Sequence, residues 1–325
     1  MILGSFMSII HKCSANGSNL TIQNNVLISK LYVELTNICN SGCVHCFNNS
    51  VMSMEEAFFD FAPVEHLLNN SPQGFSEVIL SGGEVFRVKN LLDTIIFLSS
   101  VAPVKLLTNG SIYNRAVYEY IACNNIKTQI SLIGHNETID SCVRGGIYKK
   151  TIENIKILVA LGAGDLITVS VAICAFNAEW IEEIIMLCTR LKVNTVMFTF
   201  VQKQGSAIDV WDELQLTNYQ KLNLMREIYQ QKLKYGNLIN ITTSGFKQHF
   251  APTIQNQKFD CSKLSQEIYL SFTNKVSLCP KLTKFSECMG FELDAINYKA
   301  TIEIPFNRDK CCDCNSQKGC VFSCV

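Results

Sequence analysis

Apolar residues recur along this chain with two periods that follow one another: short runs of strand length, then longer stretches with apolar positions three or four residues apart. This alternation predicts repeated βα units with right-handed crossovers and a parallel sheet. Six such units predict an α/β fold, a partial (β/α)6 barrel of the TIM type rather than a complete eight-stranded one. The expected strands are 31–35, 77–80, 104–107, 128–133, 166–173 and 195–201, and the expected helices are 54–68, 90–99, 116–122, 150–161 and 178–191.

The same pattern divides the chain into four parts. Residues 1–30 form an N-terminal extension, 31–202 the barrel, 203–260 a bridging segment with a helix near 216–235, and 261–325 a cysteine-rich part that opens on a hairpin over 268–278. In the bridge, the apolar spacing of Trp211, Tyr219, Tyr229 and Phe246 favours packing over a role in substrate binding.

A polar loop after the first expected strand carries Cys39, Cys43 and Cys46. A cubane iron–sulfur cluster takes four ligands, so this spacing supplies three thiolates and leaves one iron open to a small molecule. The carboxyl end of a barrel strand is the catalytic face, where an open iron suits a catalyst. The alternative is a zinc site completed by His45 or by a distant cysteine.

The three cysteines resemble the signature of the radical S-adenosylmethionine (radical SAM) superfamily, which has this spacing after its first barrel strand. A second motif agrees, because Gly82, Gly83 and Glu84 follow the second expected strand and match the family's Gly-Gly-Glu turn. The resemblance implies that this turn holds the methionine ammonium of SAM, since glycines permit close approach and a carboxylate suits an ammonium. The expected cofactors are therefore SAM and one [4Fe–4S] cluster.

Further cofactor contacts are implied by the same resemblance at the ends of later strands. Asn109 follows the third strand, and Ser131 in the fourth and Arg144 just beyond it match the residues that contact the cofactor and pair with its carboxylate in related enzymes. His45 replaces an aromatic residue of many relatives and is expected near the adenine. Ile133 replaces an aspartate, which predicts a reshaped substrate pocket.

The cysteines near the end of the chain have a regular spacing of their own, which resembles the SPASM domain of peptide-modifying radical SAM enzymes. That domain holds two auxiliary [4Fe–4S] clusters. The resemblance assigns Cys261, Cys279 and Cys324 to one cluster, and Cys311, Cys314 and Cys320 to the other.

Each auxiliary cluster then needs a fourth ligand. Cys288, Cys312 or a residue such as Asp294 has to serve, or an iron stays open to a substrate thiolate. Asn274 stands where the family has a glycine, and asparagine also tolerates a left-handed turn. Zinc remains the alternative for this part of the chain, because Cys-x2-Cys pairs bind zinc as well.

Composition favours an enzyme of a reducing compartment. The chain has 325 residues, is 48% hydrophobic and contains 16 cysteines without a recognisable secretion signal, which argues for metal binding rather than disulfides and for a cytoplasmic location. Lysine and arginine (28) balance aspartate and glutamate (28), so charge gives no reason to expect a nucleic-acid or membrane partner.

The family resemblance implies an enzyme that generates a 5'-deoxyadenosyl radical and abstracts hydrogen from a ribosomally made peptide or protein, most plausibly to form a thioether or carbon–carbon crosslink. The expected partners are that peptide and an electron donor such as flavodoxin or ferredoxin. About 30 residues before the first strand are few for a peptide-binding domain, so leader recognition, if needed, is expected from the barrel surface or from a separate leader-binding protein.

Three alternatives stay open from the sequence. One is a maturase that oxidises a sulfatase residue to formylglycine. Another is a peptide epimerase, for which Cys142 and Tyr148 are the candidate hydrogen donors. The third is a non-catalytic iron–sulfur electron carrier, which the methionine clamp and Arg144 argue against.

Overall fold

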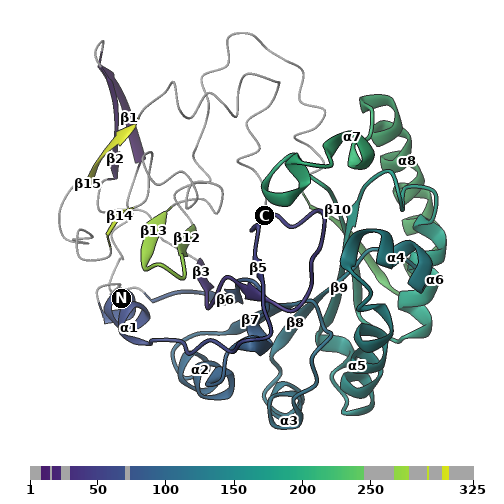
Figure 1. The fold of residues 1–325 in the computed structure, drawn as a ribbon, viewed down its shortest axis with the longest axis horizontal. Coiled ribbons are helices and arrows are strands. Elements are labelled where there is room, and N and C mark those ends of the chain that lie inside the picture. The colour runs from purple at the N-terminus through teal and green to yellow at the C-terminus, as the bar shows by residue number, and fades with distance from the viewer. Residues whose placement is uncertain are drawn as a thin grey trace, which may run out of the picture.

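The computed structural model of the chain describes residues 9–14, 17–22, 30–69, 74–244, 267–277, 291–292 and 302–306. Its main sheet has ten strands in the order β11-β10-β9-β8-β7-β6-β3-β12-β13-β14. All neighbours from β11 to β12 are parallel, and β13 and β14 continue the sheet antiparallel. The sheet curves around an open interior and carries its helices on the outside (Figure 1), so the predicted partial barrel is confirmed.

The six expected strands are all present, within one residue of the predicted positions. They are β3 (Lys30–Glu34), β6 (Glu77–Ser81), β7 (Val104–Thr108), β8 (Lys127–Leu132), β9 (Ile167–Ile173) and β10 (Thr195–Phe200). Two further parallel strands extend the sheet: β11 (Asn240–Thr243) pairs with β10, and β12 (Glu267–Leu270) pairs with β3. The bridge and the cysteine-rich part therefore each contribute one parallel strand to the sheet.

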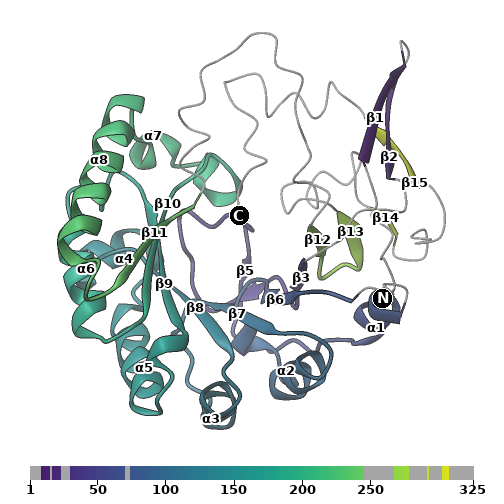
Figure 2. The ribbon, with the colours of Figure 1, turned by 180° about the vertical axis from the view of Figure 1, so that it is seen from behind.

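Helices follow most strands and cover the outer face of the sheet, as the view from behind shows (Figure 2). They are α1 (Ala62–Asn69), α2 (Leu91–Ser99), α3 (Arg115–Cys123), α4 (Glu137–Arg144), α5 (Tyr148–Ala160), α6 (Ile181–Arg190), α7 (Trp211–Leu214) and α8 (Asn218–Tyr235), with 3-10 turns η1 (Val85–Arg87), η2 (Gly164–Leu166) and η3 (Gly205–Ile208). Two differences from the sequence prediction stand out. The helix expected over 54–68 begins only at Ala62, and α4 was not expected.

The two faces of the sheet differ in what they pack against. Along β9, Ile167, Val169 and Val171 are buried in the core shared with the helices, whereas the alternate residues Thr168 and Ser170 are half-buried on the concave side. At one end of the curved sheet, Tyr32, Ile79 and Tyr269 pack together, and the rings of Tyr32 and Tyr269 stack with centroids 4.4 Å apart. The small polar residues on the concave side leave the interior available for ligands.

Short strands outside the barrel complete the description. β1 (Ile9–Ser14) and β2 (Gly17–Ile22) form an antiparallel hairpin, to which β15 (Ile302–Phe306) adds a third strand. β12 and β13 (Lys275–Ser277) form the expected hairpin, with Asn274 at φ 60° in its turn, and β14 covers Phe291–Glu292. Among the helices of the described ranges, none combines the length and apolar character that crossing a bilayer requires.

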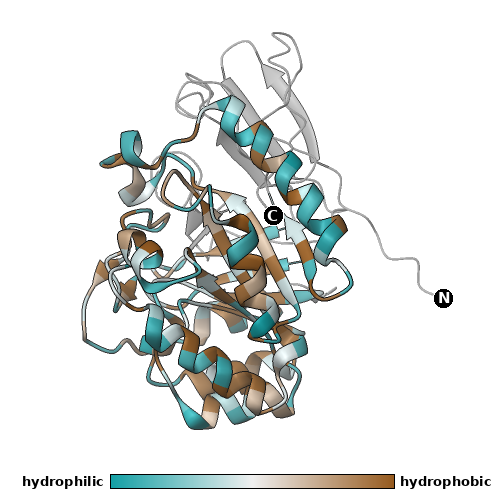
Figure 3. Cartoon of the chain, turned by 90° about the vertical axis from the view of Figure 1, so that its right-hand side faces the viewer, coloured by the Kyte–Doolittle hydropathy of each residue, from teal (hydrophilic) through white to brown (hydrophobic). Residues whose placement is uncertain are grey.

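The long helix α8 corrects the expectation for the bridging aromatics. It buries Leu224 and Ile228, but Tyr219 and Tyr229 are 73% and 61% exposed, so these two rings do not pack in the core. Figure 3 shows α8 with hydrophobic and hydrophilic residues mixed along its visible face. Trp211 of α7 is partly buried against a small apolar cluster, as expected. Phe246 lies outside the described residues.

Candidate cluster and cofactor site

The cysteine loop runs from the end of β3 to β5 (Val51–Met52) and includes the short strand β4 (Ile38–Cys39). Cys39 is buried, and Cys43 and Cys46 are half-buried. Distant parts of the chain hold the loop by its backbone: Val44 N–H donates to the carbonyl of Val143 at 3.0 Å, and Ser206 N–H donates to the carbonyl of Cys46 at 2.9 Å. The three thiols are therefore presented by a loop that α4 and η3 fix in place.

Each of the three sulfur atoms has a polar neighbour. Asn109 Nδ2 donates to Cys39 Sγ at 3.8 Å, and Ser50 N–H donates to Cys46 Sγ at 3.4 Å. Ser41 Oγ and Cys43 Sγ share a hydrogen bond of 3.3 Å. Hydrogen bonds to cluster sulfurs tune iron–sulfur centres, so the donors to Cys39 and Cys46 fit thiolates that carry iron.

Burial disfavours the ionised form of two of the three thiols, Cys39 and Cys43. Burial raises the pKa of the Cys39 thiol to about 11. It also raises the pKa of Cys43, which the positive charge of Arg144 partly offsets. A bound iron displaces the thiol proton, so metal binding would stabilise the thiolate form that burial disfavours.

Within the described residues, no three His, Cys, Asp or Glu side chains converge as ligands of one metal ion. A cubane cluster makes a different demand, because each thiolate binds a separate iron and the sulfur atoms stay apart.

The Gly82–Gly83 turn at the end of β6 packs directly against the segment that leads into the cysteine loop. Gly83 N–H donates to the carbonyl of Thr36 at 2.6 Å, and a Cβ on Gly83 would lie 2.2 Å from the carbonyl oxygen of Ile38. Gly82 has φ 140°, and a Cβ added to it would lie 2.4 Å from the Thr36 carbonyl oxygen. The glycines are thus required for the close approach of two protein loops, in addition to any contact with a cofactor.

Glu84 is fully buried, and its carboxylate is bonded within the protein. Oε1 accepts from Thr108 Oγ1 at 2.5 Å and from Phe86 N–H at 3.1 Å, and Oε2 accepts from Asn109 N–H at 2.7 Å. Burial raises the pKa of this carboxyl group, which the hydrogen bonds oppose. Glu84 joins the end of β6 to the end of β7, where the sequence had suggested a carboxylate facing the methionine ammonium.

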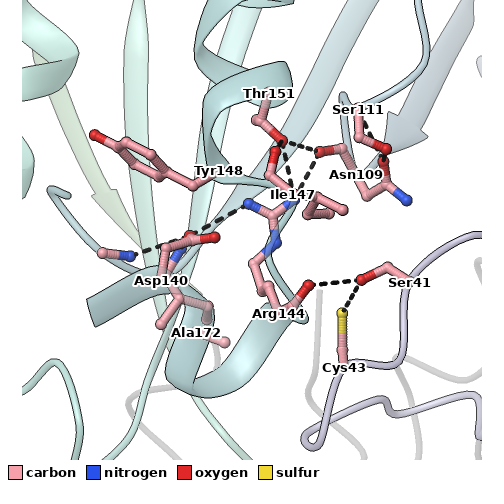
Figure 4. A network of polar contacts seen from close by, with 12 residues as sticks. Ser41, Cys43, Asn109, Ser111, Asp140, Arg144, Ile147, Tyr148, Thr151 and Ala172 are labelled. Carbon is pink, nitrogen blue, oxygen red and sulfur yellow. Dashed lines mark hydrogen bonds and ion pairs between the residues drawn. The ribbon is translucent and has the colours of Figure 1, made fainter. Parts of the chain in front are cut away.

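Arg144 is likewise engaged inside the protein, as Figure 4 shows. Its Nη2 donates to the Asn109 carbonyl at 2.6 Å and to Thr151 Oγ1 at 3.4 Å, and its Nη1 lies 3.4 Å from Asp140 Oδ2. Asp140 also accepts from Ile133 N–H at 2.9 Å. The guanidinium expected to meet the SAM carboxylate therefore forms a buried ion pair and ties the loops after β7 and β8 together.

Comparison with known proteins agrees with this arrangement of strands and loops. Residues 33–188 match the Radical SAM superfamily. This region is a radical SAM domain. It contains Cys39, Cys43 and Cys46, the Gly82–Gly83 turn and Arg144.

Among curated proteins, mycofactocin maturase MftC of Mycobacterium ulcerans (strain Agy99) is 28% identical over 200 residues, which cover 59% of this chain and 52% of that protein. The sporulation killing factor maturation protein SkfB of Bacillus subtilis (strain 168) is 22% identical over 213 residues, 64% of this chain and 51% of that protein. The chain spans about half the length of the curated relatives it matches.

Solved structures share the fold. Streptococcus suis SuiB bound to precursor peptide SuiA superposes with a TM-score of 0.66 and 16% identity, covering 92% of this chain and 71% of that one. Native anSMEcpe with bound AdoMet superposes with a TM-score of 0.59 and 13% identity, covering 77% of this chain and 74% of that one.

The radical SAM domain places the other expected cofactor residues as follows. Asn109 lies next to Cys39, and Ser131 is an exposed residue of β8 between buried Ile130 and Leu132, hence on the concave face. His45 Nδ1 is buried and has no hydrogen-bond partner in the described part of the chain. Burial and the charge of Arg144 lower the pKa of His45 to about 4, so the imidazole is neutral and keeps a polar atom free for a ligand.

The two candidate hydrogen donors are both bonded to backbone carbonyls. Cys142 is exposed on α4, and its thiol donates to the Thr138 carbonyl at 3.2 Å. The Tyr148 hydroxyl donates to the His135 carbonyl at 2.7 Å, and the ring points away from Ser41 and Cys43 in Figure 4. A role for either group in returning hydrogen to a substrate stays a prediction.

Several site residues were missed by the sequence reasoning. Ser41, Asp140 and Ser206 hold the loop or its neighbours in place, and only Ser41 has a signal in the sequence, since it lies inside the cysteine motif. The expected auxiliary-cluster ligands lie outside the described residues: Cys261, Cys279, Cys288, Asp294, Cys311, Cys312, Cys314, Cys320 and Cys324.

Proposed function

We propose that this chain is a radical SAM maturase that modifies a ribosomally made peptide and forms a thioether or carbon–carbon crosslink in it. The observation that carries the proposal is the loop of Cys39, Cys43 and Cys46, in which each sulfur has a hydrogen-bonding partner and both flanks are fixed by other loops of a radical SAM domain. The names of MftC and SkfB describe them as maturation proteins, and SuiB was solved with a precursor peptide.

The residues divide the work as follows. Cys39, Cys43 and Cys46 would hold the [4Fe–4S] cluster, and SAM would lie across the concave face between the backbone of the Gly82–Gly83 turn and Ser131. When bound, these cofactors supply one-electron cleavage of the sulfonium to methionine and a 5'-deoxyadenosyl radical that removes hydrogen from the substrate.

The remaining polar residues of the site have supporting roles in this proposal. Glu84 and Asn109 fix the edge of the site, His45 offers a neutral nitrogen to the adenine, and Arg144 provides a positive charge next to the cluster loop. Arg144 would reach the SAM carboxylate only by breaking its ion pair with Asp140. SAM binding would have to supply the free energy for this change of partner.

Three parts of the proposal rest on the family resemblance. Two auxiliary [4Fe–4S] clusters would be held in the cysteine-rich part, by the two sets of ligands given above. A flavodoxin or ferredoxin would supply electrons, and a separate protein would bind the leader of the peptide. Seven cysteines are free thiols, which suits a reducing cytoplasm: Cys39, Cys43, Cys46, Cys123, Cys142, Cys174 and Cys188.

The test is anaerobic reconstitution followed by iron counting and assay of 5'-deoxyadenosine. Wild-type protein is expected to hold about twelve irons, and the triple Cys39→Ala, Cys43→Ala, Cys46→Ala variant about eight with no SAM cleavage. Cys123→Ala, which changes an exposed cysteine of α3, is the matched control and should retain both iron and cleavage. Zinc in place of iron, or cleavage by the triple variant, would overturn the proposal.

A further inference from the structure

The side chain of Asn109 makes every hydrogen bond that an amide group can make. Its Oδ1 accepts from Ser111 N–H at 2.8 Å and from Ser111 Oγ at 2.7 Å, beside which Figure 4 draws it. Its Nδ2 donates to Asn40 Oδ1 at 2.9 Å and to Cys39 Sγ at 3.8 Å. An amide has two N–H donors and two acceptor lone pairs, so these three neighbours use its whole capacity.

The orientation of this amide is fixed by a group that can only donate. The N–H of Ser111 has to face an acceptor, so the atom next to it is Oδ1 of Asn109, and Nδ2 then faces Cys39. Asn40 Nδ2 also donates to Ser111 Oγ at 2.8 Å, which closes a ring of side-chain hydrogen bonds through Asn109, Asn40 and Ser111. The ring holds one N–H of Asn109 toward the sulfur of Cys39.

The main chain of Asn109 has a separate task. Its N–H donates to Glu84 Oε2 at 2.7 Å, and its carbonyl accepts from Arg144 Nη2 at 2.6 Å and from Thr151 Oγ1 at 3.0 Å. These bonds tie the loops of the site together and do not involve the amide group. Truncating the side chain therefore leaves them in place, which separates the contact with Cys39 from the positioning of the loops.

Cys39 differs from the other two cysteines of the loop in the origin of its side-chain donor. The described contacts of the Cys43 and Cys46 sulfur atoms are with Ser41 and Ser50, which belong to the cysteine loop itself. Asn109 lies 70 positions after Cys39, at the end of β7. Cys39 is also 8% exposed, and a hydrogen bond is electrostatically stronger in such a buried place than in water.

A donor at this sulfur changes the balance between two redox states. A cluster that gains one electron carries more negative charge, part of it on the cysteine sulfur atoms. An N–H directed at one of these atoms stabilises the reduced state more than the oxidised state. Hydrogen bonds to the sulfur atoms are among the factors that set the reduction potential of iron–sulfur clusters.

We propose that the side chain of Asn109 raises the reduction potential of the cluster on Cys39, Cys43 and Cys46, and that Asn40 and Ser111 hold its amide in the orientation that does so. The inference rests on the proposed function, because the hydrogen bond has this effect only if a cluster occupies these cysteines. Reduction adds one electron from an external donor to the cluster, and no bond forms or breaks.

The experiment is a redox titration of the reconstituted full chain, followed by electron paramagnetic resonance. The cluster is recognised as the signal that the triple Cys39→Ala, Cys43→Ala, Cys46→Ala variant lacks. Asn109→Ala should shift the equilibrium about tenfold toward the oxidised cluster, which is about 59 mV for one electron. Asn109→Asp keeps an acceptor for Ser111 but replaces the N–H with a charged oxygen, so its potential should be lower still.

Asn154→Ala is the matched control in the same region. Asn154 is a second buried asparagine, 5% exposed, and its Nδ2 donates to the carbonyl of Gly110 at 2.9 Å, one residue after Asn109. Its loss should destabilise the loop after β7 and leave the potential at the wild-type value. Equal shifts in Asn109→Ala and Asn154→Ala would assign the effect to loop position and overturn the proposal, as would a wild-type potential in Asn109→Ala.

A spectroscopic measurement tests the hydrogen bond without depending on the stability of a variant. The reduced cluster of wild type should show a hyperfine coupling to an exchangeable proton, identified by comparing samples in H2O and D2O. Asn109→Ala and Asn109→Asp should both lose this coupling, and Asn154→Ala should keep it. An unchanged set of couplings in both Asn109 variants would overturn the proposal. Failure of the proposed function would look different, because wild type and the triple cysteine variant would then give the same signals.

Discussion

The Ser41 hydroxyl donates a 2.7 Å hydrogen bond to the main-chain carbonyl of Arg144, 103 positions later in the chain. Ser41 is buried within the cysteine motif, and the same oxygen lies 3.3 Å from Cys43 Sγ. One side chain therefore joins the end of α4 to a cluster ligand. The end of α4 also bears Arg144, whose charge acts on the Cys43 thiol, so loop position and local charge are set by the same contact.

Ser41→Ala should loosen the cysteine loop. Losing the hydroxyl leaves the Arg144 carbonyl without this donor and should lower the free energy of unfolding by about 1–2 kcal/mol. Iron retained after gel filtration should fall as well. Ser100→Ala is the control, because Ser100 also donates to a backbone carbonyl but lies exposed at the end of α2. Iron retention equal to wild type would show that the loop does not depend on Ser41.

Asp140→Ala should destabilise the domain strongly. It leaves the guanidinium of Arg144, which is 1% exposed, without its carboxylate and removes the acceptor of Ile133 N–H. Breaking a buried pair in this way costs about 3–5 kcal/mol, measured by urea unfolding. Glu119→Ala breaks the exposed pair with Arg115 and should leave the urea midpoint unchanged. Similar midpoints for the two variants would contradict the buried pair.

Gly205→Ala should disturb the cysteine loop from the opposite side. Gly205 has φ 59°, and an added Cβ would lie 2.2 Å from the Cys46 carbonyl oxygen, so both backbone strain and a clash are expected. Gly162→Ala introduces the same backbone strain, at φ 89°, but the added Cβ has no atom within 4 Å. Both variants should lose about 1–2 kcal/mol of stability from strain. Only Gly205→Ala should also lose cluster iron, and equal iron contents would exclude the clash.

Stability should depend on pH through the contact between α6 and α8. Hydrogen bonds from Lys234 and Tyr235 hold the pKa of Glu182 below its ordinary value of 4.5. Near pH 4.5 the unfolded chain therefore binds more protons than the folded chain. The stabilisation that Glu182 contributes is complete above pH 4.5 and is lost as the pH falls through the lower pKa of the folded state. Wild type should be more stable than Glu182→Gln at pH 7, with the difference vanishing in acid. Glu179→Gln, at an exposed residue without an ion pair in the described ranges, should show no such difference.

The barrel was predictable because its signals are local. Each central strand is a short apolar run bounded by turn residues, and the cysteine and Gly-Gly-Glu motifs lie at strand ends. The places of β11 and β12 in the sheet were not predictable, because they depend on pairing with β10 and β3, which lie far away in the chain. α4 was missed although both of its ends carry a capping residue: the Asn136 side chain accepts from Ile139 N–H, and Gly145 is left-handed.

The false helix over 54–61 has a definite cause. Met54, Ala57, Phe58 and Phe61 have helical spacing, yet the segment is held in extended form by Arg87 and Lys89, which exchange backbone hydrogen bonds with Ala57. Met54 and Phe58 remain exposed as a result. Periodicity records where apolar residues are, but not which distant backbone will compete for their hydrogen bonds.

At the site, the sequence identified the residue types but not their partners. Glu84 and Arg144 were expected to face a ligand because the motif contains a carboxylate and a cation. In the structure Glu84 accepts hydrogen bonds from Thr108 and Asn109, which lie 24 and 25 positions after it in the chain. Arg144 forms an ion pair with Asp140. Residues that position other residues leave no pattern of their own, which is why Ser206 also escaped notice.

The bond from Ser206 N–H to the Cys46 carbonyl has a consequence for the order in which the protein is made. A nascent chain contains the three cysteines early, but the backbone that fixes Cys46 follows only after the sixth barrel strand has left the ribosome. Until then the loop has one of its tethers missing. We therefore expect iron–sulfur assembly on this chain to be a late event, coupled to completion of the barrel rather than to synthesis of the motif.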